Sequence, residues 1–247
     1  MEKQKLSSPW EFIKRSFKIY FLKENFLYLT KVNLFGLLAS IAIISPLFLL
    51  GVLGDENPDF SSIPFFIIIL FIAAVLASIV WGVWFQTTII KAVSLVVEGK
   101  TQGVKETYKL AWPKAGKYAL TGIVVGLAIA GGFLLLLIPG ILALTWFYFA
   151  SYIVVNEEVG VIEAVKKSKA LVKGYFWAVF GRWSFFMLFY ILLQAGLSFI
   201  PGIGPLVATL LSPFMVLIPY LLYEELKKIK TENVPALEEP VSSGVPA

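Results

Sequence analysis

Lysines spaced three and four residues apart are the side chains with the clearest binding chemistry in this sequence. Lys166, Lys169 and Lys173 follow this spacing, which on a helix places them on one face. A row of ammonium groups attracts anionic lipid headgroups, at about 1 kcal/mol for each basic residue near the membrane surface. We therefore predict contact with anionic lipid at the cytoplasmic face of a membrane. The candidate contact residues are Lys109, Lys166, Lys167, Lys169, Lys173 and Arg182.

Side chains that could carry catalysis are scarce. The sequence contains no His and no Cys, which removes the commonest general base, the commonest metal ligand and any thiolate nucleophile. It contains no phosphate-binding loop, HExxH motif or nucleophile elbow. The long apolar stretches hold no pair of carboxylates that could act as acid and base. We expect a protein that is not an enzyme and that uses no cofactor and no metal.

The composition indicates that lipid surrounds most of the chain. Of the 247 residues 58% are hydrophobic and only 15% are charged, whereas soluble domains carry about 25% charged residues. Four stretches lack Asp, Glu, Lys and Arg, and they cover residues 32–54, 60–90, 118–156 and 183–223. A helix crosses the hydrocarbon core with about 20 apolar residues. The first two stretches therefore supply one crossing each, and the last two supply two crossings each.

Proline and glycine divide the two longest stretches. Pro139 and Gly140 lie near the middle of the third, and Pro201 and Gly202 near the middle of the fourth. Because proline lacks the donor that a helix needs and glycine permits turn geometry, we expect hairpin turns at both places. The prediction is an all-α polytopic integral membrane protein with six transmembrane helices that form three hairpins. The spans are expected near residues 33–53, 63–87, 118–138, 141–155, 176–199 and 206–222.

The basic residues predict the orientation of the spans. With six crossings, all 21 Lys and Arg residues fall on the side of the two termini, and the other side carries Asp55, Glu56 and Asp59. Basic segments are retained in the cytoplasm, so we expect a multi-pass protein of the cell (plasma) membrane with cytoplasmic N- and C-termini. This placement accounts for the net charge of +5 without a nucleic-acid partner.

Basic segments precede each predicted hairpin, at residues 1–32, 91–117 and 156–175. Their apolar residues share one helical face and their lysines lie opposite, so we expect amphipathic helices that lie in the membrane interface with the apolar face down. Residues 1–230 would form a single membrane domain. The polar, proline-containing segment 231–247 lacks aromatic residues, which predicts a disordered cytoplasmic tail.

Small residues recur every four positions in two predicted spans. Gly122, Gly126 and Ala130 form such a face, and Gly36 with Ser40 forms a shorter one. Small faces let helix backbones approach closely. We expect them to pack against other helices of the same chain, and homo-oligomerisation or a membrane partner is the alternative.

Residues 138–182 resemble the membrane domain of some glycerophosphodiester phosphodiesterases and of many stand-alone bacterial and archaeal membrane proteins of unknown function. The matching features are Pro139-Gly140-Ile141, the aromatic segment 146–150, Glu157 to Gly160, Lys166-Lys167-Ser168 and the segment 174–177. The resemblance implies the fold and the membrane location. In members that are phosphodiesterases a separate soluble domain with His and acidic residues carries the chemistry, and this chain has no His.

Three functions fit these features. The first is a non-enzymatic membrane protein that organises lipid or a partner at the cytoplasmic leaflet. The second is a transporter or permease component for a small apolar or zwitterionic solute, suggested by Gln86, Gln194 and the prolines inside spans; it predicts a cavity lined by polar residues. The third is a membrane accessory of a phosphodiesterase.

Arg182 lies inside the fifth span, where it would snorkel to the interface, bind a headgroup or pack between helices.

Overall fold

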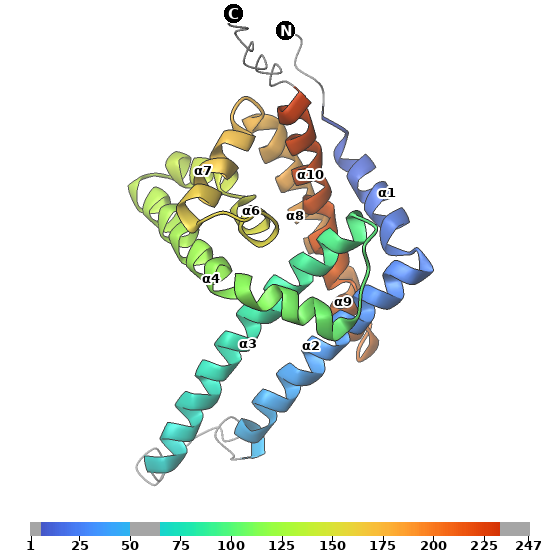
Figure 1. Ribbon diagram of the computed structural model, residues 1–247, viewed down its shortest axis with the longest axis vertical. Helices are drawn as coiled ribbons and strands as arrows, with labels where there is room; N and C mark the ends of the chain where they lie inside the picture. The colour runs from blue at the N-terminus through green and yellow to red at the C-terminus, as the bar shows by residue number, and fades with distance from the viewer. Residues whose placement is uncertain (1–5, 50–64, 233–247) are drawn as a thin grey trace, which may run out of the picture.

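The computed structural model describes residues 6–49 and 65–232, and the regular secondary structure in these ranges is α-helical (Figure 1). The helices are α1 (Pro9–Tyr20), α2 (Lys23–Leu49), α3 (Phe65–Val97), α4 (Val104–Leu135), α5 (Leu137–Trp146), α6 (Ala150–Asn156), α7 (Val161–Val172), α8 (Phe176–Ser198), α9 (Ile203–Leu210) and α10 (Ser212–Glu232).

Six segments of the described chain are long and apolar enough to cross a membrane. They are Lys23–Ser45, Phe65–Val97, Val104–Leu135, Leu137–Asn156, Phe176–Ser198 and Ile203–Glu232. Each overlaps one predicted span, so the prediction of an all-α chain with six apolar spans is confirmed. The end of the first predicted span, the acidic loop that follows it and most of the predicted C-terminal tail lie outside the described residues. The first two residues of that tail, Thr231 and Glu232, belong to α10.

The helices extend further toward the charged segments than the sequence predicted. The segment 91–117 is not a separate interfacial helix, because its first residues continue α3 to Val97 and its last part is continuous with the third span in α4. Apolar residues such as Ala92, Val93 and Val96 continue the pattern of α3 past Lys91 and are buried. The charge at Lys91 marks the end of the apolar stretch but not the end of the helix.

The hydrophobic core lies where the charged ends of the helices meet. Its members come from α1, the first turns of α2, the last turns of α3, and from α4, α6, α7, α8 and α10. The apolar faces of the basic segments form part of it: Phe12 and Tyr20 of α1, Tyr108 of α4, and Leu171 and Val172 of α7 are buried. The expectation that these faces lie on lipid is therefore not confirmed. The protein covers these residues, because packing against neighbouring helices buries their apolar side chains.

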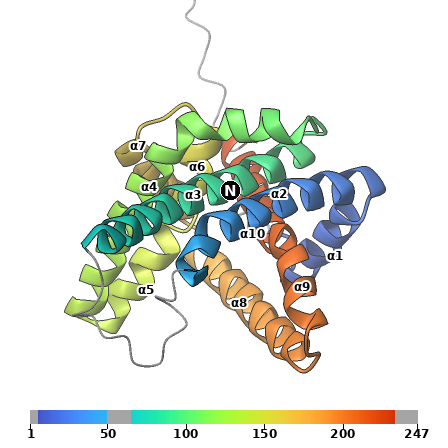
Figure 2. The same cartoon turned by 90° about the horizontal axis from the view of Figure 1, so that it is seen from below.

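The remaining lengths of the long helices leave the core and expose apolar side chains. The α2–α3 pair extends well beyond the rest of the molecule (Figure 1), and α8 with α9 projects separately in Figure 2. Leu134 is 88% exposed, Phe199 85% and Phe65 76%. Apolar surface of this extent is rare on monomeric soluble proteins. Lipid is the environment that accommodates it.

The fourth span is broken between α5 and α6, and α7 bridges the break. The Ser168 hydroxyl of α7 donates to the carbonyl of Trp146 (2.7 Å) and accepts from the N–H of Phe149 (3.1 Å). Ser168 is fully buried. Both backbone groups are thus satisfied by protein, as a break at membrane depth requires.

The sixth span is broken between α9 and α10, and side chains of α1 and α2 bridge it in the same way. The Asn33 amide donates to the carbonyl of Thr209 (2.7 Å), and the Tyr20 hydroxyl donates to the carbonyl of Leu210 (2.6 Å). Pro213 follows as the second residue of α10, where a missing N–H costs no helical hydrogen bond.

The turn between α4 and α5 lies earlier than predicted. Leu136 is extended, with φ −169° and ψ 160°, and separates the two helices. Pro139 and Gly140 belong to α5, where proline is tolerated in the first turn because those N–H groups have no helical partner. Gly140 instead allows close packing, since a Cβ on Gly132 would lie 2.9 Å from its Cα. Pro201 and Gly202 do lie in the turn before α9, and Gly202 has the left-handed φ of 76° that favours glycine.

Candidate functional site

Glu157, the residue after α6, is the centre of an ionic network between three helices. Its carboxylate accepts a hydrogen bond from the Tyr223 hydroxyl (2.8 Å) and lies 3.1 Å from the ammonium groups of Lys167 and Lys227. Beside it, Glu158 pairs with Lys114 of α4. Together these contacts hold α4, α7 and α10 around the end of the fourth span.

The network predicts a loss of stability in acid. Burial raises the pKa of the Glu157 carboxyl, but the hydrogen bonds from Tyr223, Lys167 and Lys227 outweigh this effect and hold its pKa below the ordinary value. Because the pKa is lower in the folded than in the unfolded chain, the stabilisation is present above the ordinary Glu pKa of about 4.3 and is lost as the pH falls through the folded pKa.

We therefore expect Glu157→Gln to unfold at a lower temperature than the wild type at neutral pH, and to lose less stability on acidification. Thermal unfolding in detergent micelles, followed by tryptophan fluorescence from neutral to acidic pH, measures both. Glu163→Gln is the control, because Glu163 is an exposed residue that shares Lys167 with Glu157. Parallel pH curves for the wild type and Glu157→Gln would contradict this role.

Arg182 and Glu225 hold the N-terminal segment from two sides. The Arg182 guanidinium donates to the carbonyls of Leu6 (2.8 Å) and Ser7 (2.9 and 2.5 Å) and to Ala178 of its own helix (2.8 Å). Glu225 of α10 accepts from the N–H (2.6 Å) and the hydroxyl (2.9 Å) of Ser7. Arg182 therefore packs between helices, one of the roles expected for it, and its contact with lipid stays a prediction. Sequence patterns could not predict this contact, since its partners are backbone carbonyls about 175 residues away.

The predicted lipid-contact lysines fall into two groups. Lys167 is paired with Glu157 and Glu163, and Lys169 lies over the Trp146 ring, 4.5 Å from its centroid. The side chains of Lys109, Lys166 and Lys173 are exposed and have no partner among residues 6–49 and 65–232. Among the predicted contact residues, these three carry the ammonium groups that remain available to an external anion.

The small residues of α4 do not pack inside the chain as expected. Gly122, Gly126 and Ala130 are exposed, and a Cβ on either glycine would meet nothing within 4 Å. By contrast, Gly36 lies against the Phe85 ring and the Tyr108 hydroxyl. The Trp81 indole also donates to the Gly36 carbonyl (3.1 Å) and to the Ser40 hydroxyl (2.9 Å). The face of Gly36 and Ser40 therefore packs within the chain, against side chains of α3 and α4.

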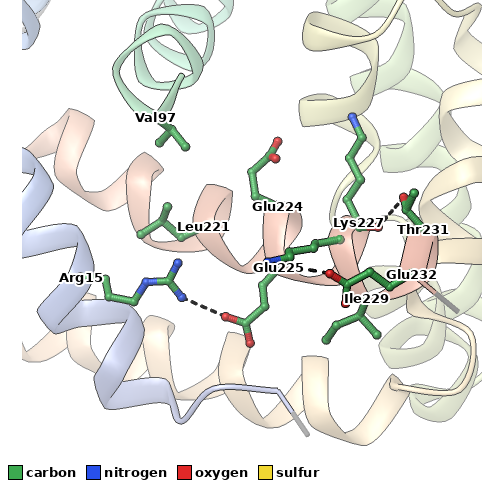
Figure 3. A pocket seen from close by; sticks show the side chains of 10 residues that line it. Arg15, Val97, Leu221, Glu224, Glu225, Lys227, Ile229, Thr231 and Glu232 are labelled. Carbon is green, nitrogen blue, oxygen red and sulfur yellow. Dashed lines mark hydrogen bonds and ion pairs between the residues drawn. The ribbon is translucent and has the colours of Figure 1, made fainter. Parts of the chain in front are cut away.

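A groove of about 880 Å³ follows α10 on its side toward α1 and the end of α3 (Figure 3). Its charged lining residues are Arg15, Glu224, Glu225, Lys227, Lys228 and Glu232. Arg15 pairs with Glu225 at 3.0 Å and Lys228 with Glu232 at 3.8 Å, while the Glu224 carboxylate points into the groove in Figure 3. Positive and negative side chains are equally represented, so the groove does not favour an anion or a cation.

The polar residues that suggested transport do not come together. Gln86 is exposed on α3, and the Gln194 amide donates to the Tyr190 hydroxyl of its own helix (2.9 Å). Neither residue lines the groove along α10. Within the described ranges, no group of three or more His, Cys, Asp and Glu side chains could hold a metal ion.

The six apolar spans of the described chain, with their exposed apolar side chains, define the class: this is a multi-pass α-helical membrane protein. Comparison of the chain with protein-family models, with curated proteins and with solved structures found no match. The resemblance of residues 138–182 to the phosphodiesterase membrane domain therefore stays a prediction.

Proposed function

We propose that this protein is a non-enzymatic membrane protein that holds anionic lipid at the cytoplasmic leaflet. The observation that carries the proposal is the row of lysines on the outer face of α7. Lys166 and Lys173 are exposed without a carboxylate partner, whereas Lys167, which lies off this row, is paired with two. An external phosphate is the partner that would neutralise the row.

Exposed apolar residues at both ends of the row support a membrane surface as its environment. Ile162 precedes Lys166 by one helical turn and is 57% exposed, and Trp177 follows Lys173 and is 78% exposed. Tryptophan favours the membrane–water interface, where its ring contacts apolar chains and its N–H remains near polar groups. Alternating lysine and apolar side chains suit the boundary between headgroups and acyl chains.

In the proposed arrangement three helical hairpins cross the cell membrane: α2 with α3, α4 with α5 and α6, and α8 with α9 and α10. The basic segments in α1, at the start of α4 and in α7 would lie at the cytoplasmic interface, and both termini would be cytoplasmic. Figure 2 is compatible with this orientation, because α7 and the first half of α4 lie opposite the turn between α8 and α9. The retention of basic segments in the cytoplasm supports the choice of side.

The lipid preference can be measured by co-purification. The protein is reconstituted in vesicles with equal parts phosphatidylglycerol and phosphatidylcholine, extracted with mild detergent, and its bound lipids are quantified. We expect enrichment of phosphatidylglycerol. The triple variant Lys166→Gln, Lys169→Gln, Lys173→Gln should lower this enrichment at least about tenfold, because each lysine contributes about 1 kcal/mol.

The matched control removes the same charge from another helix, with Lys14, Lys18 and Lys23 each replaced by Gln; all three are exposed. The control should retain the enrichment. Equal enrichment in the wild type and in the α7 variant would exclude the proposal. A similar loss in both variants would indicate a response to net charge alone, which also contradicts a site on α7.

We do not propose solute transport or a phosphodiesterase accessory role. Transporters use the free carbonyls of broken helices to bind ions or substrate. Here carbonyls at the two breaks accept hydrogen bonds from Ser168, Asn33 and Tyr20. The breaks therefore serve packing, and nothing in the described residues favours a phosphodiesterase partner.

A further inference from the structure

A second cavity, of about 270 Å³, lies between α6, α8 and α10. All of its lining residues belong to candidate membrane spans. They are Tyr148, Tyr152, Trp183, Phe186, Met187, Tyr190, Met215, Val216, Ile218 and Pro219. The lining contains no charged side chain, so an ion or a phosphate would lose its hydration without compensation there. The cavity suits an apolar ligand.

Three lining residues carry hydrogen-bond donors that lack an acceptor. The hydroxyls of Tyr148 and Tyr152 and the indole N–H of Trp183 have no hydrogen bond within the described parts of the chain, in contrast to Trp81 and Trp84, whose indoles donate to backbone carbonyls. All three residues are half-buried, so their donors remain open to a ligand in the cavity. A ligand in this cavity would therefore contribute acceptor oxygens as well as apolar surface.

The depth of these donors indicates which acceptor is available. Tyr152 precedes the charged Glu157 by five residues on a helix, which is roughly 7 Å at about 1.5 Å per residue. Trp183 adjoins Arg182. The donors thus lie just below the charged surface, in the layer between headgroups and hydrocarbon, where the ester carbonyls of phospholipids are found.

We propose that this cavity binds one acyl chain of a phospholipid. The chain packs on the aromatic and methionine side chains of α8 and α10, and its ester carbonyl accepts hydrogen bonds from the tyrosines. This site goes beyond the proposed headgroup contact, because it requires a chain and an ester but no anionic headgroup. Zwitterionic lipid should therefore occupy it.

The test uses the full-length protein in pure phosphatidylcholine vesicles with a trace of phosphatidylcholine that carries a photoreactive diazirine on one chain. After illumination, adducts are mapped by mass spectrometry. We expect at least about fivefold more labelling in residues 183–190 and 215–219 than in residues 65–80, whose apolar side chains are largely exposed and report general lipid contact. Equal labelling of these segments would overturn the proposal.

Two variants test the cavity itself. Val216→Trp fills it and should reduce adducts in residues 183–190 to the level of residues 65–80. The double variant Tyr148→Phe, Tyr152→Phe removes only hydroxyls, so it keeps the fold and should lower the labelling severalfold. Labelling that survives both changes would contradict the site.

Two further experiments distinguish a phospholipid from a free fatty acid as the ligand, and the acyl-chain site from the headgroup site. A diazirine fatty acid in place of the phospholipid tests whether an ester is needed, and labelling by the free acid alone would overturn the proposal. The triple variant Lys166→Gln, Lys169→Gln, Lys173→Gln should label like the wild type, since the vesicles contain no anionic lipid. The chain site can thus fail or succeed independently of the headgroup site.

Discussion

Replacing Arg182 with methionine should lower the free energy of unfolding by at least about 3 kcal/mol, because hydrogen bonds to charged groups contribute about 1.5–3 kcal/mol each. Four such bonds are lost, to the carbonyls of Leu6, Ser7 and Ala178. Methionine keeps much of the apolar stem. The N-terminal segment would then keep its contacts with Glu225, whose carboxylate would lose one nearby positive charge and retain Arg15.

Chemical unfolding in mixed micelles, followed by tryptophan fluorescence, measures this loss. Arg182→Lys should recover part of the stability, since one ammonium group cannot reach all three carbonyls as a guanidinium does. Lys166→Met is the control, because it removes an exposed cation without a described partner. A surface substitution usually changes the free energy of unfolding by less than about 0.5 kcal/mol. A change as small as this in Arg182→Met would contradict the packing role.

Alanine at Gly36 should destabilise the protein by about 1–3 kcal/mol, the typical cost of overpacking a core. Its Cβ would enter the space of the Phe85 ring and the Tyr108 hydroxyl. Tyr108 cannot move freely, because its hydroxyl donates to the Val32 carbonyl (3.1 Å) and its ring stacks on Trp81. The cost exceeds the gain in helix propensity of about 1 kcal/mol from Gly to Ala.

Gly82→Ala is the matched control for this prediction. Gly82 lies on α3 next to the same aromatic cluster, but a Cβ there would meet nothing within 4 Å. Its stability should stay the same or rise, so the two variants should shift the unfolding midpoint in opposite directions. Equal shifts would show that the change reflects helix propensity alone and not the contact between α2 and α3.

The number and type of the spans could be predicted because they depend on local composition. A stretch without charged residues is visible in the sequence. Each of the six spans predicted from such stretches overlaps a segment that is long and apolar enough to cross a membrane. The ends of the helices could be predicted less well from the sequence. Lys91 ends an apolar stretch, yet α3 continues to Val97, since burial in the core depends on neighbours that are distant in the chain.

The role of a single residue could be predicted only where the backbone conformation alone determines which residue type fits. Gly202 lies in a turn as predicted, and the turn gives it a positive φ, which favours glycine. Pro139 fits both a turn and the first turn of a helix, and the structure adopts the second. The spacing of Gly122 and Gly126 matched Gly36 and Ser40, but only the latter pair faces another helix. A small-residue pattern does not identify its partner.

The lysine row was visible in the sequence, but the partners of its members were not. Lys166 and Lys167 are adjacent and chemically identical. Lys167 is paired with Glu157 and Glu163, whereas Lys166, one residue earlier on α7, is exposed and pairs with neither. Which lysines remain free thus depends on the fold, and the proposed lipid contact narrows to Lys109, Lys166 and Lys173, with Lys169 beside Trp146.

Six spans should place α7 and the end of α10 on the cytoplasmic side of the membrane and the turns after α4 and α8 on the other side. The chain contains no Cys, so single cysteines can be introduced without background. Lys166→Cys, Thr231→Cys, Leu136→Cys and Ile200→Cys are labelled with a membrane-impermeant maleimide in intact cells and in inverted vesicles. We expect positions 136 and 200 to react only in intact cells and positions 166 and 231 only in inverted vesicles. Reaction of positions 166 and 136 from the same side of the membrane would contradict it.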